Sequence, residues 1–412
     1  MSTTTTLERL SPGQHLGPFE VVQLLKEGGQ ATVYLARIAT SERPPVERLR
    51  RRLAWFGASP ALVAREGLCV LKLAVPGKRE SLIDEHAYLL QLRAVSIRTG
   101  AAPASLVQLF SSPELKTSDR QRGLDGIWNS PFVDAAGHAL PFIALPYAPG
   151  GALDSLLRTR YPRPLPPAVA IEIVFQVIEA LTFLHQQVDL VHHDLAPSNI
   201  VLREPLSPWF ARPPACMLVD LAAADSPSHP RLRTIFGRSS YLPPQRLKHK
   251  LPISPAIDVY GLGVVLYELL GGALPQPSLD QATGLPRPLP PLNEQRPELS
   301  PELVELVMHT VSHDQRRWPS LAQFALSLKA TPEARGNPAL RGRLERPVLL
   351  VVLGSAFALV LVVLLLLFSL SPPLEPPLVA TALPATITPQ PTRTPTMTPT
   401  PLPPTSTPIS QP

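Results

Sequence analysis

The sequence has little cysteine and no concentrated positive charge. Its 412 residues include only Cys69 and Cys216, each inside an apolar stretch. Two isolated cysteines exclude a disulfide framework and a zinc site built on paired cysteines, so we expect buried thiols in a reducing compartment. The formal net charge is +6, and the basic residues are dispersed apart from a short run at 48–52. Nucleic-acid binding is therefore not expected.

The N-terminus, MSTTTTLERL, also lacks an apolar segment, so no signal peptide is predicted. The long apolar run lies near the other end, where residues 348–370 carry no charge. As a helix this run is about 35 Å long, enough to cross a bilayer core, and it would serve as both signal and anchor. Arg341, Arg343 and Arg346 precede it, so the positive-inside rule predicts that residues 1–347 are cytoplasmic, with the N-terminus in and the C-terminus out. A buried core helix is the alternative, which the length and the flanks disfavour.

Proline is the opposite case, with 53 residues against a usual share of about 5%. Many of them lie in 371–412, a Pro/Thr-rich segment with repeated Thr-Pro steps. Such a composition predicts a disordered extracytoplasmic tail, because it buries too little apolar surface to fold. A sensory role is the alternative, but the segment shows no repeat, no alternating strand pattern and no aromatic anchor.

The segment 191–200, VHHDLAPSNI, carries the clearest chemical signal. It sets Asp194 and Asn199 five residues apart behind two histidines. This spacing resembles the protein-kinase catalytic loop, whose aspartate orients the substrate hydroxyl and whose asparagine holds magnesium. The resemblance implies that Asp194 is catalytic and that Asn199 is a metal ligand. His193 departs from the usual arginine, and Ala196 from the lysine of Ser/Thr kinases.

The segment 21–36, VVQLLKEGGQATVYLA, reads as strand, turn and strand. It is similar to the kinase glycine-rich loop, in which small residues let backbone N–H groups approach the nucleotide phosphates. Aligned on Val33, it keeps Gly28 and replaces the other two glycines with Lys26 and Ala31. An ordinary hairpin with a Gly-Gly turn is the alternative.

A charged residue interrupts the apolar strand 68–74, LCVLKLA, at Lys72. This strand resembles the one whose lysine pairs the α and β phosphates of the nucleotide. Downstream, apolar residues at helical spacing place Glu85 as the partner of Lys72, while Asp84 lies about 100° away around the helix. A surface lysine whose stem covers apolar groups is the alternative.

Three further segments follow in the order found in kinases. The stretch 142–156 resembles the hinge that holds adenine, 169–185 predicts a helix with one apolar face, and MLVDLA at 217–222 places Asp220 where kinases have a magnesium ligand. Asp258 stands at the position that usually holds the catalytic loop.

Together these motifs resemble the bacterial membrane-anchored Ser/Thr kinases of eukaryotic type. The resemblance implies an α+β, bilobal protein-kinase-like fold, with a small antiparallel-sheet N-lobe and a mostly helical C-lobe, to which one C-terminal transmembrane helix is added. It implies ATP and Mg²⁺ as cofactors, with Asn199 and Asp220 on the metal and cytoplasmic proteins as substrates. The implied ATP-binding residues are Leu25, Gly28, Gly29, Val33, Val70, Lys72, Glu85, Leu145, Pro146, Tyr147, Ala148 and Val201. The predicted organisation is a flexible N-terminus at 1–17, a kinase-like domain at 18–330 (N-lobe about 18–147, C-lobe about 148–330), a basic juxtamembrane linker at 331–347, the helix at 348–370 and the tail at 371–412.

Two insertions, at 39–66 and 116–138, separate this chain from a minimal kinase. In the first, a helical face formed by Val46, Leu49, Leu53 and Phe56 lies beside four arginines, Arg48, Arg50, Arg51 and Arg52. A helical insertion with a solvated basic face is predicted, and a membrane-surface helix is the alternative.

Two functions remain open. An active kinase is favoured because the five polar residues that the resemblance requires are present: Lys72, Glu85, Asp194, Asn199 and Asp220. A pseudokinase acting as a nucleotide-responsive binding or scaffold module is favoured by five substitutions: Lys26, Ala31, Val70, Ala196 and Ala222. The imidazole of His193 cannot receive a phosphate as a guanidinium does, so activation-segment phosphorylation is not expected to be required. A homodimer is possible, but nothing in the sequence indicates one.

Overall fold

The structure is a computed structural model that describes residues 9–40, 43–56, 58–112, 115, 126–159, 164–205, 214–230, 239–247, 252–272, 274 and 287–336. The chain divides into two compact units, Met1–Leu350 and Val351–Pro412, and all the described residues lie in the first. The segments predicted as a transmembrane helix (348–370) and a tail (371–412) lie outside the described residues.

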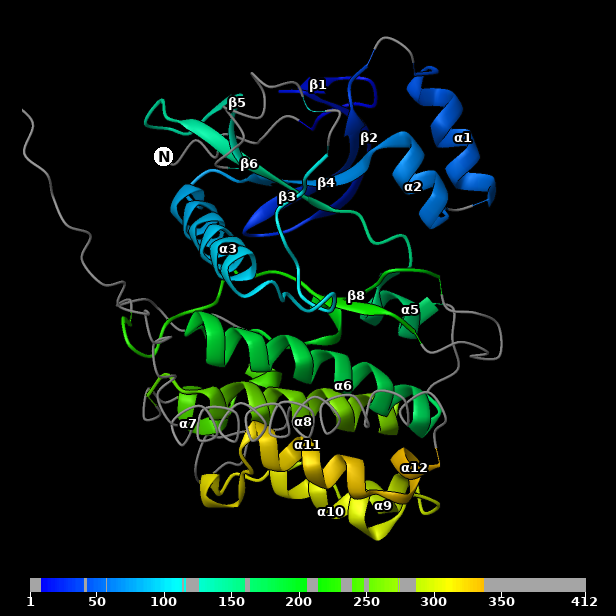
Figure 1. The fold of residues 1–412 in the computed structure, drawn as a ribbon, viewed down its shortest axis with the longest axis vertical. Helices are drawn as coiled ribbons and strands as arrows, with labels where there is room; N and C mark the ends of the chain where they lie inside the picture. Colours follow the sequence, from blue (N-terminus) through cyan, green and yellow to red (C-terminus); the bar gives the residue numbers. More distant parts are fainter. Residues whose placement is uncertain are drawn as a thin grey trace, which may run out of the picture. The chain divides into compact units, whose positions relative to one another are not determined.

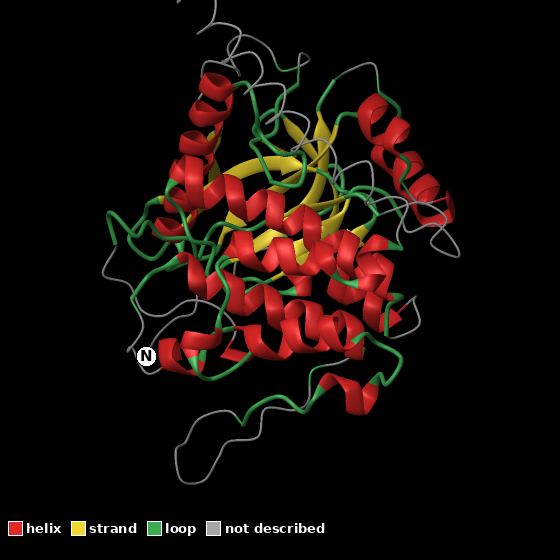
Figure 2. Ribbon diagram, turned by 60° about the horizontal axis from the view of Figure 1, so that its bottom comes forward, coloured by secondary structure: helices red, strands yellow, loops and turns green. Residues whose placement is uncertain are grey.

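The N-terminal part is built on a six-stranded antiparallel sheet (Figures 1 and 2). Its strands, in the spatial order β1-β2-β3-β4-β6-β5, are β1 (His15–Leu16), β2 (Phe19–Glu27), β3 (Ala31–Ile38), β4 (Leu68–Ala74), β6 (Ala139–Pro146) and β5 (Ile127–Val133). Three helices accompany it: α1 (Val46–Phe56), α2 (Pro60–Glu66) and α3 (Arg79–Thr99).

Alternation along the strands gives the sheet two different faces. On one face, Phe19, Leu71 and Phe142 are fully buried in a cluster with Trp128 packed against it. On the other face, α3 contacts β6, and α1 and α2 contact β2 and β4. This second face also carries Lys72. One face of the sheet is therefore covered by the apolar cluster, and the other face borders a cleft.

The C-terminal part is mostly helical and includes a small sheet, of which β8 is labelled in Figure 1. The sheet has the order β7-β8-β9, formed by β7 (Gly151–Ala152), β8 (Ile200–Leu202) and β9 (Cys216–Leu218). The helices are α5 (Leu153–Thr159), α6 (Pro167–Phe183), α7 (Pro244–Leu247), α8 (Pro255–Gly271), α9 (Leu292–Gln295), α10 (Pro301–Thr310), α11 (Leu321–Ala330) and α12 (Pro332–Arg335), with 3-10 turns at Pro197–Asn199, Ser239–Tyr241 and Gln315–Arg317.

The helix at Pro167–Val188, which comprises α6 and a π-helical turn, is long and apolar enough to cross a membrane by length and composition alone. However, 78% of its apolar 18-residue stretch is buried inside the protein, and Ile173, Val174 and Leu181 are fully buried. It contacts α8, α11 and α12. We therefore interpret it as the core helix of this part.

The ends of the folded part differ from the predicted boundaries. Residues 9–17 are not a flexible N-terminus, because Leu10 is buried and β1 pairs with β2. At the other end, α12 follows the predicted end at 330, and Glu333 accepts hydrogen bonds from the backbone and hydroxyl of Ser300 at 2.7 and 2.8 Å. These contacts bring α12 into the fold instead of the linker.

Both predicted insertions contain regular structure. In the first, Val46 and Leu49 of α1 are buried against sheet residues, and Tyr147 packs against the same cluster. The apolar face of α1 is thus covered by protein, so a membrane-surface helix lying on that face is wrong. In the second, β5 pairs with β6 and forms an edge of the sheet.

Candidate nucleotide site

A cavity of about 610 Å³ opens on the cleft face of the sheet. Its volume falls in the range of small-molecule sites, about 300–1,000 Å³. Strands β2, β3, β4 and β6 line one side, and β8, β9 and the segment after β9 line the other. The predicted site residues that line it are Leu25, Val33, Val70, Lys72, Glu85, Leu145, Pro146, Tyr147, Ala148, Asn199, Val201 and Asp220.

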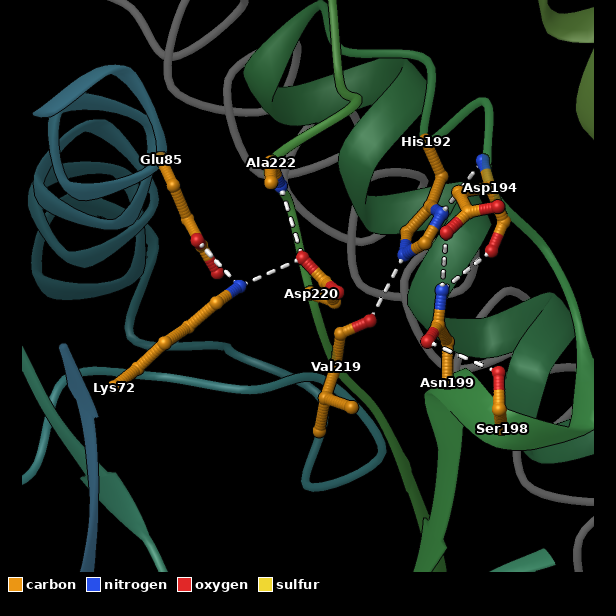
Figure 3. A network of polar contacts seen from close by, with 9 residues as sticks. All are labelled: Lys72, Glu85, His192, Asp194, Ser198, Asn199, Val219, Asp220 and Ala222. Atoms are coloured by element: carbon orange, nitrogen blue, oxygen red, sulfur yellow. Dashed lines mark hydrogen bonds and ion pairs between the residues drawn. The ribbon is translucent and has the colours of Figure 1, made fainter. Parts of the chain in front are cut away.

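Lys72 joins the two sides of the cavity (Figure 3). Its Nζ lies 2.6 Å from Glu85 Oε2 and 2.8 Å from Asp220 Oδ1. Register fixes Lys72 in the sheet, since it stands between Val33 of β3 and Ile143 of β6. Glu85 lies on α3 and is only 1% exposed.

Lys72 and Asp220 stabilise each other's charge, whereas burial, together with the negative charge of Asp220, raises the pKa of Glu85 despite its contact with Lys72. Burial opposes ionisation of both Lys72 and Asp220, but the attraction and hydrogen bond between them outweigh it. As a result, the pKa of Lys72 is raised and the pKa of Asp220 is lowered to about 2. Asp220 therefore presents an ionised carboxylate at neutral pH.

A second set of contacts shapes the segment around Asp194 (Figure 3). The side-chain amide of Asn199 donates to the backbone oxygen of Asp194 at 2.7 Å and to its Oδ2 at 2.8 Å. The carboxylate of Asp258, on α8, accepts hydrogen bonds from the backbone N–H groups of His192 at 2.7 Å and His193 at 2.9 Å. We refer to Lys72, Glu85, Asp194, Asn199 and Asp220 as the polar cluster.

The backbone of this region adopts uncommon conformations. His193 has φ 66° and Asp220 has φ 73°, in the left-handed region that costs most residues about 1–3 kcal/mol. The contacts from Asp258 to the segment containing His193, and from Lys72 to Asp220, hold these conformations in place. Such conformations cluster at functional sites.

His193 itself is buried. Its side chain is 5% exposed, and its Nε2 has no hydrogen-bond partner among the residues that the structure describes. Burial lowers the pKa of His193 to about 4, although Asp258 opposes this shift. The imidazole is therefore neutral at physiological pH.

Three predicted residues do not line the cavity, namely Gly28, Gly29 and Asp194. Gly28 closes the turn between β2 and β3 by donating to the Ala31 carbonyl at 3.1 Å. Neither glycine has a positive φ, and a Cβ on Gly29 would contact nothing within 4 Å. Lys26, one of the substituted positions, does line the cavity.

The structure adds residues that the motifs did not indicate. Met217 and Val219, which precede Asp220 in the chain, line the cavity. They are two residues apart, so the alternation of side chains along the predicted strand MLVDLA could have identified them. Val107 and Arg158 also contribute. Arg158 forms an i,i+4 ion pair on α5 with Asp154, at 3.0 Å. No local motif in the sequence indicated Val107 or Arg158.

The donor set suits a hard cation. The side-chain nitrogen of Asn199 donates to Asp194, and the Oδ1 of Asn199 accepts a long hydrogen bond of 3.3 Å from the Ser198 hydroxyl. Asp220 supplies an ionised carboxylate. Within the described ranges, no group of three or more His, Cys, Asp or Glu side chains could hold a metal alone. The oxygens of Asn199 and Asp220 are of the kind that would hold Mg²⁺, which binds through one or two carboxylates and completes its shell with water and phosphates.

Comparisons with known proteins agree with this geometry. The family model described as protein kinase domain matches residues 134–327. PknB, a Ser/Thr protein kinase of Mycobacterium leprae, is 29% identical over 54% of this chain and 32% of its own length. PknF of Mycobacterium tuberculosis is 26% identical over 80% of this chain and 59% of its own length. The chain is thus similar to protein kinases, over the residues that the family model matches and in its similarity to PknB and PknF.

The coverage of these relatives is partial. The chain spans between about a third and three fifths of the length of PknB and PknF. Among solved structures, a double mutant of the PknI kinase domain from Mycobacterium tuberculosis aligns with 20% identity and a TM-score of 0.49, covering 79% of this chain and 99% of that one.

Proposed function

We propose that this protein is a Ser/Thr protein kinase that transfers the γ-phosphate of ATP to hydroxyl groups of cytoplasmic proteins. The observation that carries the proposal is Lys72, which bonds to Glu85 and Asp220 at once. These contacts align the strand lysine, the α3 glutamate and the metal-ligand aspartate, which protein kinases require for phosphate transfer.

The polar cluster divides the chemistry among its members. Lys72 would bind the α and β phosphates, and Asn199 and Asp220 would hold Mg²⁺, which neutralises developing charge on the phosphates when bound. Asp194 would accept the proton of the substrate hydroxyl. Its carboxylate is oriented by Asn199 at 2.8 Å.

The decisive experiment uses the purified full chain with labelled ATP and Mg²⁺, and follows phosphate incorporation into itself and a general protein substrate. Asp194→Asn is the matched control, since it preserves shape and removes the base. Incorporation that depends on Asp194 supports the proposal, whereas equal incorporation by the variant overturns it.

A pseudokinase is the second candidate, favoured by the substitutions around the cavity. Ala196 stands where a phosphate-directed lysine would be, and its side chain is fully buried. Losing one preorganised donor costs about 10²–10³ in rate, which slows a kinase without removing its mechanism. A thermal shift with ATP and Mg²⁺ but no phosphate transfer would favour the pseudokinase.

The membrane placement is a separate part of the proposal. Residues 348–370 would form a single-pass helix that keeps the kinase domain, about 18–330, on the cytoplasmic side. Protease treatment of sealed cells tests this topology. Cleavage within 371–412 with the kinase domain protected is expected, and a chain released by alkaline carbonate would contradict it.

A further inference from the structure

Helix α1 has an exposed face that the fold does not use. Its buried stripe contains Val46 and Leu49. At about 100° per residue, Arg48, Arg51, Arg52 and Trp55 lie within an arc of about 100° on the other side of the helix. All four are exposed, and Trp55 is 83% exposed. We call these four residues the Arg-Trp face.

The arginines of this face have no partner within the described part of the chain. None of Arg48, Arg51 and Arg52 forms a side-chain hydrogen bond or an ion pair with a described residue, whereas Arg50, on the flank of the helix, lies 3.9 Å from Glu47. Trp55 is the most exposed of the large apolar side chains in the described residues. A large indole beside unpaired cations indicates a binding surface more than a stabilising one.

The chemistry of the face selects its partner. Three guanidinium groups without a carboxylate among them complement negative charge. Trp is enriched at the headgroup level of bilayers, and arginines near an anionic leaflet are attracted to it. The same chain carries the apolar segment 348–370 with Arg341, Arg343 and Arg346 before it. A tethered domain would therefore meet a bilayer surface at high local concentration.

We propose that the Arg-Trp face docks on the anionic lipid headgroups of the membrane that holds the chain, with Trp55 inserted at the interface. The proposal rests on the membrane placement given above and is independent of phosphate transfer. Each arginine is expected to favour the docked state by about fivefold. Salt should weaken docking, because charges separated by more than about 10 Å are screened at 0.1 M ionic strength.

The test measures the environment of Trp55 in the full chain reconstituted into vesicles. Lipids brominated on their acyl chains quench an inserted indole. Trp55→Phe supplies the background of the other three tryptophans, since the chain has four. We expect quenching specific to Trp55 in vesicles that contain phosphatidylserine, little in phosphatidylcholine alone, and a decrease with added salt.

Two charge variants on the same helix sharpen the test. The triple variant Arg48→Glu, Arg51→Glu and Arg52→Glu should lose the quenching, whereas Arg50→Glu, whose native side chain lies on the flank near Glu47, should retain it. Far-ultraviolet circular dichroism and thermal melting establish that the variants fold.

Each alternative outcome overturns the proposal. An absence of Trp55 quenching, or equal quenching in neutral and anionic vesicles, rules out recognition of anionic lipid. Protection of Trp55 by polyglutamate but not by vesicles would instead assign the face to an acidic protein. Extraction of the same vesicles with alkaline carbonate tests the membrane anchor separately. A chain that carbonate releases contradicts the anchor, and quenching of Trp55 on vesicles added to that released chain still tests whether the Arg-Trp face binds anionic lipid.

Discussion

The polar cluster and the β2–β3 hairpin, whose strand residues Lys26 and Val33 line the cavity, differ in how they are held. Lys72 contacts Glu85 and Asp220 within 2.8 Å, and each of the three comes from a separate packed segment. The turn is closed by one hydrogen bond, from Gly28 to Ala31, and its glycines do not line the cavity. The charged contacts are thus fixed by packed elements, whereas the glycines of the turn lie away from the cavity lining.

Removing the base of the polar cluster should have the largest effect. Asp194→Asn is expected to lower kcat by about 10²–10⁴-fold, because general-base assistance contributes that much. ATP affinity should change little, since Asp194 does not line the cavity. Steady-state kinetics and isothermal titration with ATP and Mg²⁺ measure the two quantities, and a parallel loss of affinity would contradict this division of roles.

The stability of the segment around the cluster should depend on pH through His193. Its pKa is lowered to about 4 by burial, against about 6.5 when unfolded. The unfolded chain therefore binds more protons between these values, so this contribution is complete above pH 6.5 and is lost as pH falls toward 4. Summed over that window it is about 3 kcal/mol.

His193→Gln should remove this pH dependence while leaving stability at pH 7.5 nearly unchanged. Thermal melts of the full chain in detergent across pH 4–7.5 measure it. His15→Gln, at an exposed position, is the control and should melt like the parent chain. An unchanged acid dependence in His193→Gln would show that this histidine is not the group responsible.

Restoring a cation near the catalytic segment should have a moderate effect. Ala196→Lys is expected to raise kcat by about tenfold, because one preorganised electrostatic donor contributes up to about 10²–10³ and part of that gain is lost in fitting the chain where Ala196 is buried. Ala196→Met, of similar length and without charge, is the matched control. An equal gain from methionine would mean that charge is not the cause.

The smallest change is expected at the β2–β3 hairpin. Lys26 lines the cavity, and an exposed ammonium near phosphate contributes about 0.2–1 kcal/mol. Lys26→Met should therefore weaken ATP binding by about two- to fivefold without changing kcat. Lys329→Met, on α11, should leave the affinity unchanged. A loss much greater than this would contradict the prediction, because it would make Lys26 as important for ATP binding as the polar cluster.

The local patterns of the sequence predicted the strand carrying Lys72, the helix carrying Glu85 and the apolar strand that begins at 142, because apolar patterns are read within a few residues. The contact between Lys72 and Asp220 joins residues 148 positions apart, and only the family resemblance placed them together. Strand β5 falls in the segment predicted only as an insertion, and it pairs with β6, the next strand along the chain. Val107 followed no motif at all.

Tyr147 belongs to two neighbourhoods, the cavity lining and the cluster formed by α1, α2 and the sheet. The hinge and the insertion are consequently expected to evolve together. Relatives with a shorter insertion should have a smaller or more polar residue at the position of Tyr147, and those that retain it should preserve apolar residues at the positions of Leu49 and Leu53.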